Sequence, residues 1–353
     1  MRIHLIGRRD ASRRLGGDAL QIDETADVYR AAGHRATVVH QPHDLAPAAG
    51  DVVHLHNIQR VLDWGDLPER ASAAGARVLL TPLSPPTDEY HRRGRRGLDA
   101  GIAKLVPDPD LFAGLRWGTR GGLRERAAAV LGAVDRILLV HEGEAPLLRR
   151  DLGDFGTPTS VVPVAIPEPG DVEPADAPFE APFVVCAGRI EPLKNPLGVL
   201  EAATRARAPI AFVGPTAGAR HAGYVARFRA AVLAAGRTRA RFLGELPRTD
   251  LLALLRRARA HVLGSWTEVV GRVTLEAAAL GAAAVLTDVG FAPRYLEGTG
   301  ARVVPTGDVD AMTGAIEASM AAPRPGLDGA LSRRVRTRYT WPAVGPRVLE
   351  ALG

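Results

Sequence analysis

The stretch Ala260-His-Val-Leu-Gly-Ser-Trp-Thr-Glu-Val-Val-Gly-Arg-Val-Thr-Leu-Glu276 combines the end of a strand, a polar loop and the start of a helix. The apolar pair Val262–Leu263 is typical of a buried strand, and a helical pattern resumes after Gly271. A loop between a strand and a helix N-terminus presents backbone N–H groups that favour an anion. Glu268 on the loop and Glu276 inside the helix bracket this place. Because carboxylates repel phosphate, we expect both to accept hydrogen bonds from hydroxyls, which a sugar nucleotide carries on either side of its diphosphate.

The Glu-x7-Glu spacing with its internal glycine is followed by Ala277-Ala-Ala-Leu-Gly281 and by the strand-like Ala284-Val-Leu-Thr-Asp288. Together these features resemble the retaining GT-B glycosyltransferases of family four, the glycosyl transferases of group one. Two glutamates at this spacing also occur by chance in an Ala/Glu-rich helical region. The resemblance therefore depends on the flanking residues and on a second, cationic motif.

The resemblance implies a role for each residue of the loop. Glu268 would lie near the donor sugar as a catalytic residue, and Glu276 would hold the ribose. The backbone amides of Val269, Val270 and Gly271 would bind the distal phosphate of the donor. The expected donor is a nucleotide-diphosphate sugar, with a UDP-sugar preferred.

The cationic motif, Gly188-Arg189-Ile-Glu-Pro-Leu-Lys194-Asn195, directly follows the strand-like Phe183–Ala187. By resemblance, Arg189 and Lys194 are catalytic cations that bind the diphosphate. Breaking an anomeric bond leaves negative charge on phosphate, and fixed cations stabilise that charge more in the transition state than in the ground state. The alternative is a surface pair of cations in an arginine-rich chain. Against it, the chain has only two lysines, Lys104 and Lys194, and one of them stands in this motif.

Two further loops match donor-binding loops of the family. Phe212-Val-Gly-Pro215 implies a phosphate contact at Gly214, and Phe242-Leu-Gly-Glu-Leu246 implies a nucleobase contact at Leu246. Base contacts in the family are mostly to backbone atoms, so these residues do not identify the base.

Gly16-Gly17 lies between the first predicted strand, Ile3–Ile6, and a helix that runs from Asp18 to Ala31. Glycines there let backbone approach a ligand at the carboxyl edge of an open α/β sheet. The loop lacks the Gly-x-Gly-x-x-Gly pattern, so dinucleotide binding is not predicted. The resemblance places Gly16 and Gly17 under the donor diphosphate and beside the acceptor. A glycine-rich turn without function is the alternative.

The length of 353 residues predicts two domains, and strands that alternate with helices predict parallel sheets. We expect an α/β protein of GT-B architecture, with two Rossmann-like domains facing each other across a cleft. The predicted parts are an acceptor-side domain at 1–165, a proline-rich and acidic linker at 166–182, and a nucleotide-sugar domain at 183–338. A terminal helix at 339–353 would cross back to the first domain.

Composition excludes several classes of protein. Hydrophobic residues make up 46% and charged residues 24%, no apolar run approaches the ~18 residues of a membrane span, and no signal peptide is evident, so we expect a cytoplasmic protein. The single cysteine, Cys186, lies in an apolar strand and is expected to be a core residue. The net charge of +6 invites a nucleic-acid partner, but aromatic residues are only 5% and no base-reading module occurs.

The region 91–126 carries nine Lys/Arg residues against four acidic ones. It would suit an anionic acceptor or peripheral contact with a membrane surface, and a solvated basic helix or loop explains it equally well. The resemblance is weak here. The family often places a histidine after the fourth strand, near the donor sugar, whereas this chain has Thr81-Pro-Leu-Ser-Pro-Pro86 and its nearest histidine is His91.

We therefore predict a retaining glycosyltransferase that uses a front-face mechanism without a metal or other cofactor, with an acceptor of small-molecule, glycan or lipid-linked type. A GT-B sugar-nucleotide epimerase and a non-catalytic sugar-nucleotide-binding protein remain alternatives, and the oligomeric state stays open. The triplets Asp108-Pro-Asp110 and Asp308-Val-Asp310 could suggest a metal site. The first lies among prolines that favour turns, and Asp308 precedes a helical pattern and is predicted to be its N-cap.

Overall fold

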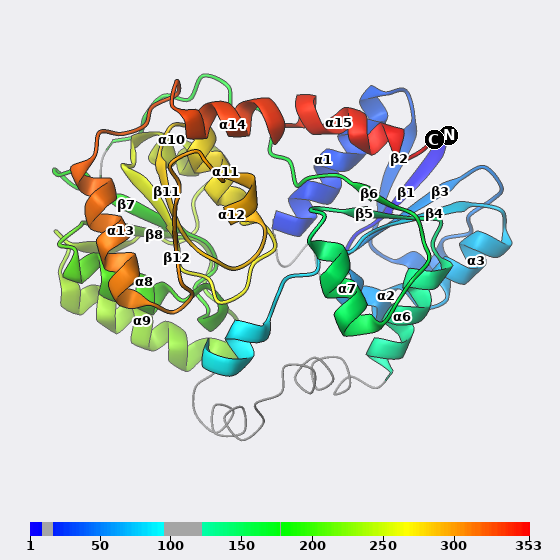
Figure 1. Cartoon of the computed structure of the whole chain (residues 1–353), viewed down its shortest axis with the longest axis horizontal. Helices are drawn as coiled ribbons and strands as arrows, with labels where there is room; N and C mark the ends of the chain where they lie inside the picture. The colour runs from blue at the N-terminus through cyan, green and yellow to red at the C-terminus, as the bar shows by residue number, and fades with distance from the viewer. Residues whose placement is uncertain (9–16, 95–121, 177) are drawn as a thin grey trace. The chain divides into compact units, whose positions relative to one another are not determined.

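The computed structural model describes residues 1–8, 17–94, 122–176 and 178–353. Figure 1 shows two compact α/β units. Unit 1 comprises Met1–Ser84, Val106–Pro167 and Tyr339–Gly353, and unit 2 comprises Pro85–Leu105 and Glu168–Arg338. Each unit is built on a six-stranded sheet, as predicted for an α/β protein. Among the described residues, no helix has both the length and the apolarity that crossing a membrane requires.

The sheet of unit 1 has the order β2-β1-β3-β4-β5-β6, and every pairing is parallel. Its strands are β1 (Arg2–Ile6), β2 (Arg35–Val39), β3 (Val52–His56), β4 (Arg77–Thr81), β5 (Arg136–Leu139) and β6 (Thr159–Val161). Its described helices are α1 (Gly17–Ala31), α2 (Val61–Trp64), α3 (Leu67–Ala73), α6 (Leu123–Ala133), α7 (Glu144–Leu152) and α15 (Trp341–Glu350), with short 3-10 turns η1 (Pro42–Asp44) and η2 (Ile58–Arg60).

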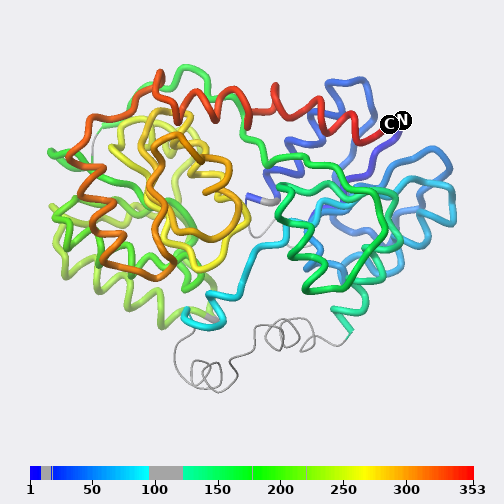
Figure 2. The backbone as a smooth tube through the Cα atoms, in the orientation of Figure 1, coloured from blue at the N-terminus to red at the C-terminus, as the bar shows by residue number. Residues whose placement is uncertain are grey.

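Both faces of this sheet are covered, which explains why its inner strands β3, β4 and β5 are almost wholly buried. Side chains alternate between the faces, so Val53 and Leu55 of β3 join one apolar cluster while Val52 joins the other. The second cluster includes Val344 and Val348 of α15. Figure 2 traces this last segment of the chain, in red, to the end that lies in unit 1.

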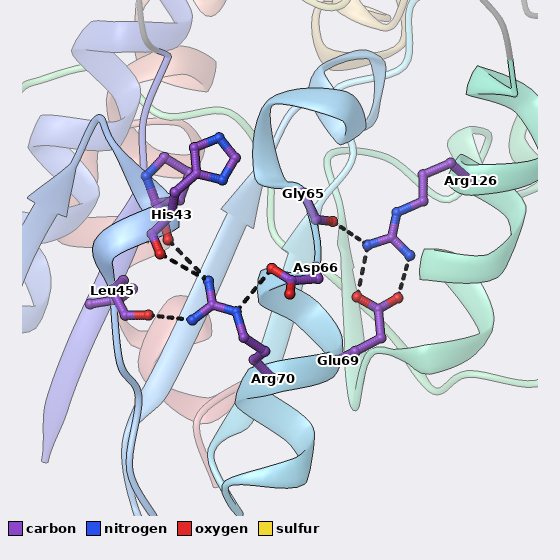
Figure 3. A network of polar contacts seen from close by, with 8 residues as sticks. His43, Leu45, Gly65, Asp66, Glu69, Arg70 and Arg126 are labelled. Carbon is purple, nitrogen blue, oxygen red and sulfur yellow. Dashed lines mark hydrogen bonds and ion pairs between the residues drawn. The ribbon is translucent and has the colours of Figure 1, made fainter.

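Arginine side chains form hydrogen bonds and ion pairs between helices and neighbouring loops in unit 1 (Figure 3). Arg126 of α6 is paired with Glu69 of α3, with Nη2 and Oε2 2.7 Å apart, and it also donates to the carbonyl of Gly65. The Arg126 guanidinium lowers the pKa of the Glu69 carboxyl. Arg70 donates from Nη1 to the carbonyl of Leu45 at 2.7 Å. These contacts join α3 to α6 and to the chain after β2.

The sheet of unit 2 has the order β12-β11-β10-β7-β8-β9, again with only parallel pairings. Its strands are β7 (Val184–Ala187), β8 (Ile210–Val213), β9 (Ala240–Phe242), β10 (Ala260–Leu263), β11 (Ala283–Thr287) and β12 (Arg302–Val304). Its described helices are α8 (Pro196–Arg205), α9 (Ala222–Ala235), α10 (Arg248–Arg257), α11 (Arg272–Ala279), α12 (Ala292–Tyr295), α13 (Val309–Ala321) and α14 (Ala330–Arg338), with the short turns η3 (Tyr90–Gly94), η4 (Pro192–Lys194) and η5 (Ala219–His221).

Strand order reverses in the middle of this second sheet. The chain runs from β7 outward through β8 to β9, and then returns to place β10 on the other side of β7. Ala260 and His261 of β10 pair with Val184 and Val185 of β7. The loops that follow β7 and β10 therefore leave the sheet side by side at its carboxyl edge. Such a reversal is where open α/β sheets bind ligands.

The predicted strands Ile3–Ile6, Phe183–Ala187 and Ala284–Asp288 agree with β1, β7 and β11 to within one residue. The sequence also predicts strands at Arg77–Thr81, Ile210–Val213 and Arg302–Val304, which coincide with β4, β8 and β12. The sequence predicts Asn195, which precedes Pro196, and Asp308 as helix N-caps. Both predictions are confirmed, because Asn195 accepts from the Gly198 amide and Asp308 from the Ala311 amide. Cys186 is buried as expected. The sequence predicts a helix at Leu251–Ala258, whereas α10 begins three residues earlier, and α14 was not predicted.

Three helices of unit 2 end near the edge where β10 begins, and two arginines bind their last carbonyl groups. Arg324 donates from Nε to the carbonyl of Ala258 at 3.0 Å and from Nη2 to that of Leu280 at 2.7 Å. Arg259 donates from Nη1 to the carbonyl of Ala322 at 2.8 Å. These carbonyls belong to the C-caps of α10, α11 and α13, where a cation also opposes the negative end of the helix dipole.

The Arg324→Met variant tests how much the contacts of Arg324 with the two helix ends stabilise the protein. Burial lowers the pKa of Arg324 to about 10, and the like charges of Arg256 and Arg259 add to the shift, so charge repulsion offsets part of the gain. We expect a loss of about 2 kcal/mol in the free energy of unfolding, because two helix-end carbonyls lose a charged donor. Urea denaturation should show a lower midpoint at unchanged slope. Arg229→Met, on an exposed position of α9, is the control. A midpoint at or above the parent's would mean that the repulsion dominates.

Candidate functional site

The first group of candidate site residues lies where the loops after β7 and β10 meet. Lys194 of η4 and Glu268 of the loop after β10, which are 74 residues apart in sequence, form a direct ion pair through Nζ and Oε2. Their side chains are 24% and 14% exposed, so the pair is only partly screened by water. The hydroxyl of Ser265 also approaches Glu268 Oε2, at 3.5 Å. Two candidate residues from separate sequence motifs are thus in contact.

The path of the loop that carries Glu268 is fixed by close backbone approaches. Gly290 has a φ of 74°, and a Cβ there would collide with the carbonyl oxygens of Glu268 and Val269. The Phe291 amide donates to the carbonyl of Val269 at 2.7 Å. The Thr287 hydroxyl donates to the carbonyl of Ser265 at 2.8 Å. The end of β11 and the residues that follow it therefore fix the backbone of the loop after β10.

The same loop presents unused backbone donors. Within the described parts of the chain, the N–H groups of Val269, Val270 and Gly271 make no hydrogen bond. Gly271 adopts the left-handed conformation, with a φ of 72°, and is the N-cap of α11. Consecutive N–H groups beside a helix N-terminus form a concave anion site. The residues predicted to bind a distal phosphate thus have the donors for it.

Arg189 lies on the loop after β7 but is not joined to the Lys194–Glu268 pair. Its Nε is 3.4 Å from Glu191 Oε1, and its side chain is 41% exposed. Among the described residues no hydrogen bond or ion pair links it to Lys194 or Glu268. The structure therefore brings Lys194 and Glu268 together and leaves Arg189 at the surface of the loop.

Glu276 lies on the buried side of α11, with its side chain only 4% exposed. Its Oε1 accepts a hydrogen bond from Nη1 of Arg248 at 2.9 Å. Arg248 is the first residue of α10 and follows Pro247, and its side chain is 37% exposed. Arg248 was not predicted from the sequence to belong to this site.

The other predicted donor-binding residues differ in what they can offer. The N–H of Gly214 donates to the carbonyl of Gly244 at 2.8 Å, so it is not open to a phosphate. A Cβ at Gly214 would collide with the carbonyl of Gly188, so its glycine serves the close approach of two loops. Leu246 is partly buried and packs against the core beside α10 and α11. Gly17 begins α1 in unit 1, and Gly16 lies outside the described residues.

His261, which was not predicted from the sequence to have a role, is a buried polar residue beneath this site. Its Nε2 accepts from the Ala187 amide at 3.4 Å, and its Nδ1 is 3.2 Å from the hydroxyl of Thr274. Burial lowers the pKa of His261 to about 4, so the ring is neutral at pH 7. It connects the end of β7 to α11. A histidine in the middle of the otherwise apolar β10 was the available signal.

Unit 1 holds its own polar groups at the carboxyl ends of its strands. His54 contacts the hydroxyl of Thr81 through Nε2 at 2.8 Å and that of Tyr29 through Nδ1 at 3.1 Å. Glu144 accepts from the amides of Ser84 at 2.7 Å and Val140 at 2.8 Å, and burial raises its pKa to about 7. These bonds satisfy buried groups within unit 1.

The described residues contain no group of three or more His, Cys, Asp or Glu side chains arranged to hold a metal ion. The carboxylate of Asp308 accepts from the amide of Ala311 at 2.9 Å as the N-cap of α13. Asp108 and Asp110 lie outside the described residues, as do 95–121 of the basic region at 91–126.

The fold of this chain is similar to that of solved glycosyltransferase structures. Sucrose-phosphate synthase of Thermosynechococcus elongatus is 17% identical at a TM-score of 0.75, covering 100% of this chain and 98% of that one. HepE of Anabaena, in complex with UDP and glucose, is 14% identical at a TM-score of 0.73, covering 100% and 99%. A glycosyltransferase of Rickettsia africae is 13% identical at a TM-score of 0.70, covering 99% and 97%. With its two parallel sheets, the chain has the GT-B fold.

The second unit carries the match to a known protein family. Residues 172–336 match the family model of glycosyl transferases group 1. The chain therefore carries a group 1 glycosyltransferase domain of family four, the retaining class that transfers a sugar from a nucleotide sugar. No curated protein sequence matches the chain significantly.

Lys194→Met and Arg189→Met test the cations. If they meet charge that grows as the donor bond breaks, each should lower kcat, by about 100-fold for Lys194, and raise KM for the donor far less. Arg189 should have the smaller effect, because its side chain is more exposed and makes no contact with the Lys194–Glu268 pair. Steady-state kinetics with Arg229→Met as control would measure this. A rise in KM at constant kcat would mean that the cations bind only the ground state.

Proposed function

We propose that this chain transfers a sugar from a nucleotide-diphosphate sugar, preferably a UDP-sugar, to an acceptor hydroxyl with retention and without a metal ion. The observation that carries the proposal is the contact of Lys194 with Glu268 beside three unused backbone donors at residues 269–271. A cation and N–H groups suit a diphosphate, and a carboxylate beside them suits the hydroxyls of a sugar. HepE, which shares the fold, binds UDP and glucose, and this supports a UDP-sugar.

Each residue has a role in this proposal. The amides of Val269, Val270 and Gly271 bind the distal phosphate, and Lys194 and Arg189 neutralise the diphosphate. Glu268 accepts from hydroxyls of the donor sugar while it remains paired with Lys194. The nucleoside lies between Glu276, which accepts from the ribose, and the backbone near Leu246. The glycine at 214 keeps the loops after β7 and β8 close enough to approach the phosphates.

In the proposed reaction, the bond between the anomeric carbon and the phosphate oxygen breaks as the acceptor oxygen bonds to the same face of that carbon. The acceptor proton passes to the departing phosphate oxygen, so the nucleoside diphosphate leaves and no protein nucleophile is required. Charge builds on that phosphate, where Lys194 and the loop amides are already oriented. Fixed donors of this kind lower the barrier because they need not reorganise during the reaction.

A first test concerns Glu276. The Glu276→Gln variant should bind UDP about 10- to 100-fold more weakly, because hydrogen bonds to a charged acceptor contribute ~1.5–3 kcal/mol. Titration calorimetry of UDP binding to both proteins would measure the change, and Glu201→Gln, on the exposed side of α8, is a control. Equal affinity of the parent and the variant would remove Glu276 from the nucleotide site.

A second test concerns the metal and the reaction itself. We expect release of nucleoside diphosphate from a panel of UDP-, GDP-, ADP- and TDP-sugars with an acceptor library to persist in EDTA, because the cations of Lys194 and Arg189 replace a metal's charge. Asp308→Asn should retain activity, since its carboxylate caps α13. Loss of turnover in EDTA that Mn²⁺ or Mg²⁺ restores would contradict the proposal. Epimerised donor without acceptor would favour an epimerase, and binding without turnover would favour a binding protein.

A further inference from the structure

We infer that Arg248 is a positioning residue of the nucleoside site that acts through Glu276, an assignment that rests on the proposed role of Glu276 in binding ribose. The inference starts from the hydrogen bond of 2.9 Å between Arg248 Nη1 and Glu276 Oε1. This bond joins the first residue of α10 to the middle of α11.

The location of Arg248 is unfavourable for its own helix. Arg248 is the first residue of α10, where the positive end of the helix dipole repels a cation. The acidic residue of this first turn, Asp250, is what the dipole favours there. Interactions within α10 therefore do not explain a cation at its first position, whereas the pairing with Glu276 does.

Packing of the two helices does not require the ion pair. Leu254, Leu255 and Ala258 from the α10 side share an apolar cluster with Ala277 and Leu280 from the α11 side. This buried cluster holds α10 against α11 through apolar contacts. An ion pair with one partner 37% exposed adds little to the stability of a protein.

Glu276, in contrast, depends on a cationic partner. Its side chain is 4% exposed, and a carboxylate at that depth is costly unless it is paired and hydrogen-bonded. The hydrogen bond from Arg248 restricts the rotation of the Glu276 carboxylate. A carboxylate held in one orientation binds vicinal hydroxyls with less loss of side-chain entropy than a free one.

The pair also joins two parts of the proposed nucleoside site. Arg248 lies two residues after Leu246, the residue predicted to contact the base, and Pro247 stiffens the chain between them. The hydrogen bond to Glu276 therefore sets the position of the base-contacting loop relative to the ribose-binding carboxylate. Arg248 thus acts on ribose recognition through another residue.

A double-mutant cycle tests this inference. UDP and 2′-deoxy-UDP are titrated into the parent, Arg248→Met, Glu276→Ala and the double variant. We expect Arg248→Met to weaken UDP binding about 5- to 20-fold and 2′-deoxy-UDP binding by much less, because the orientation of the carboxylate matters for the missing hydroxyl. In the Glu276→Ala background, Arg248→Met should change UDP affinity less than twofold.

Two controls separate positioning from a structural role. Arg248→Lys keeps a cation near Glu276 and should recover part of the UDP affinity. Arg257→Met changes an exposed arginine at the other end of α10 and should leave UDP affinity unchanged. Thermal melting of Arg248→Met should stay within a few degrees of the parent, which shows that the variant is folded.

The outcomes distinguish this inference from the proposed function. If Glu276→Ala leaves UDP affinity unchanged, the ribose-binding role of Glu276 fails, and the role of Arg248 fails with it. If Glu276→Ala weakens binding but the effects of the two substitutions simply add, Arg248 contacts the nucleotide itself and the positioning role is wrong. If Arg248→Met has no effect on UDP while Glu276→Ala has one, only the Arg248 inference is overturned.

Discussion

The pairing of β10 with β7 in the middle of the second sheet is the constraint on which the candidate site depends. The strands are parallel, so both loops leave at the same edge, and the strand order reverses between them. No crossover helix has to pass over that edge at the reversal, which leaves room for a ligand. The contact of Lys194 with Glu268 is a direct result, since a chain separation of 74 residues is closed by adjacent strands. Any change that shifted β10 relative to β7 would separate the two charges.

The loops at this edge are held by the protein before any donor binds. Gly290 admits the carbonyls of Glu268 and Val269 where a side chain would collide with them. Neutral His261 bonds the end of β7 and approaches Thr274 of α11 beneath the loop. A low dielectric under the site strengthens the interactions above it. The proposed catalysis by fixed charges and amides requires this rigidity, because donors that moved during the reaction would lose much of their advantage.

The fold could be predicted from the sequence because its signals are local. Apolar runs marked the buried strands, and short polar side chains before Pro196 and Val309 marked helix starts. The site was only partly predictable. Family-like spacing indicated Glu268 and Lys194. Arg248 belongs to no such spacing, and a cation in the first turn of a helix is not a signal of a helix start, as an acidic residue would be. Gly214 was expected to offer an amide, and the bond of that amide to Gly244 depends on a neighbouring loop that no local pattern reveals.

The structure gives a physical reason why nearly all cationic side chains of this protein are arginines. Arg324, Arg259 and Arg126 each donate to backbone carbonyls, and the planar fork of a guanidinium can bind two such acceptors at once. This is a structural use, in which the acceptors do not change. Lys194 differs, since its compact ammonium is paired with Glu268 and has three donors that can turn toward a new partner. Under the proposed function, the phosphate gains charge as the bond breaks, and an ammonium on a flexible stem can follow it while still contacting the carboxylate. A rigid guanidinium bonded to Glu268 could not follow the developing charge in this way. The lysine at this position is therefore consistent with a site where charge changes, in a chain that uses arginine where it does not.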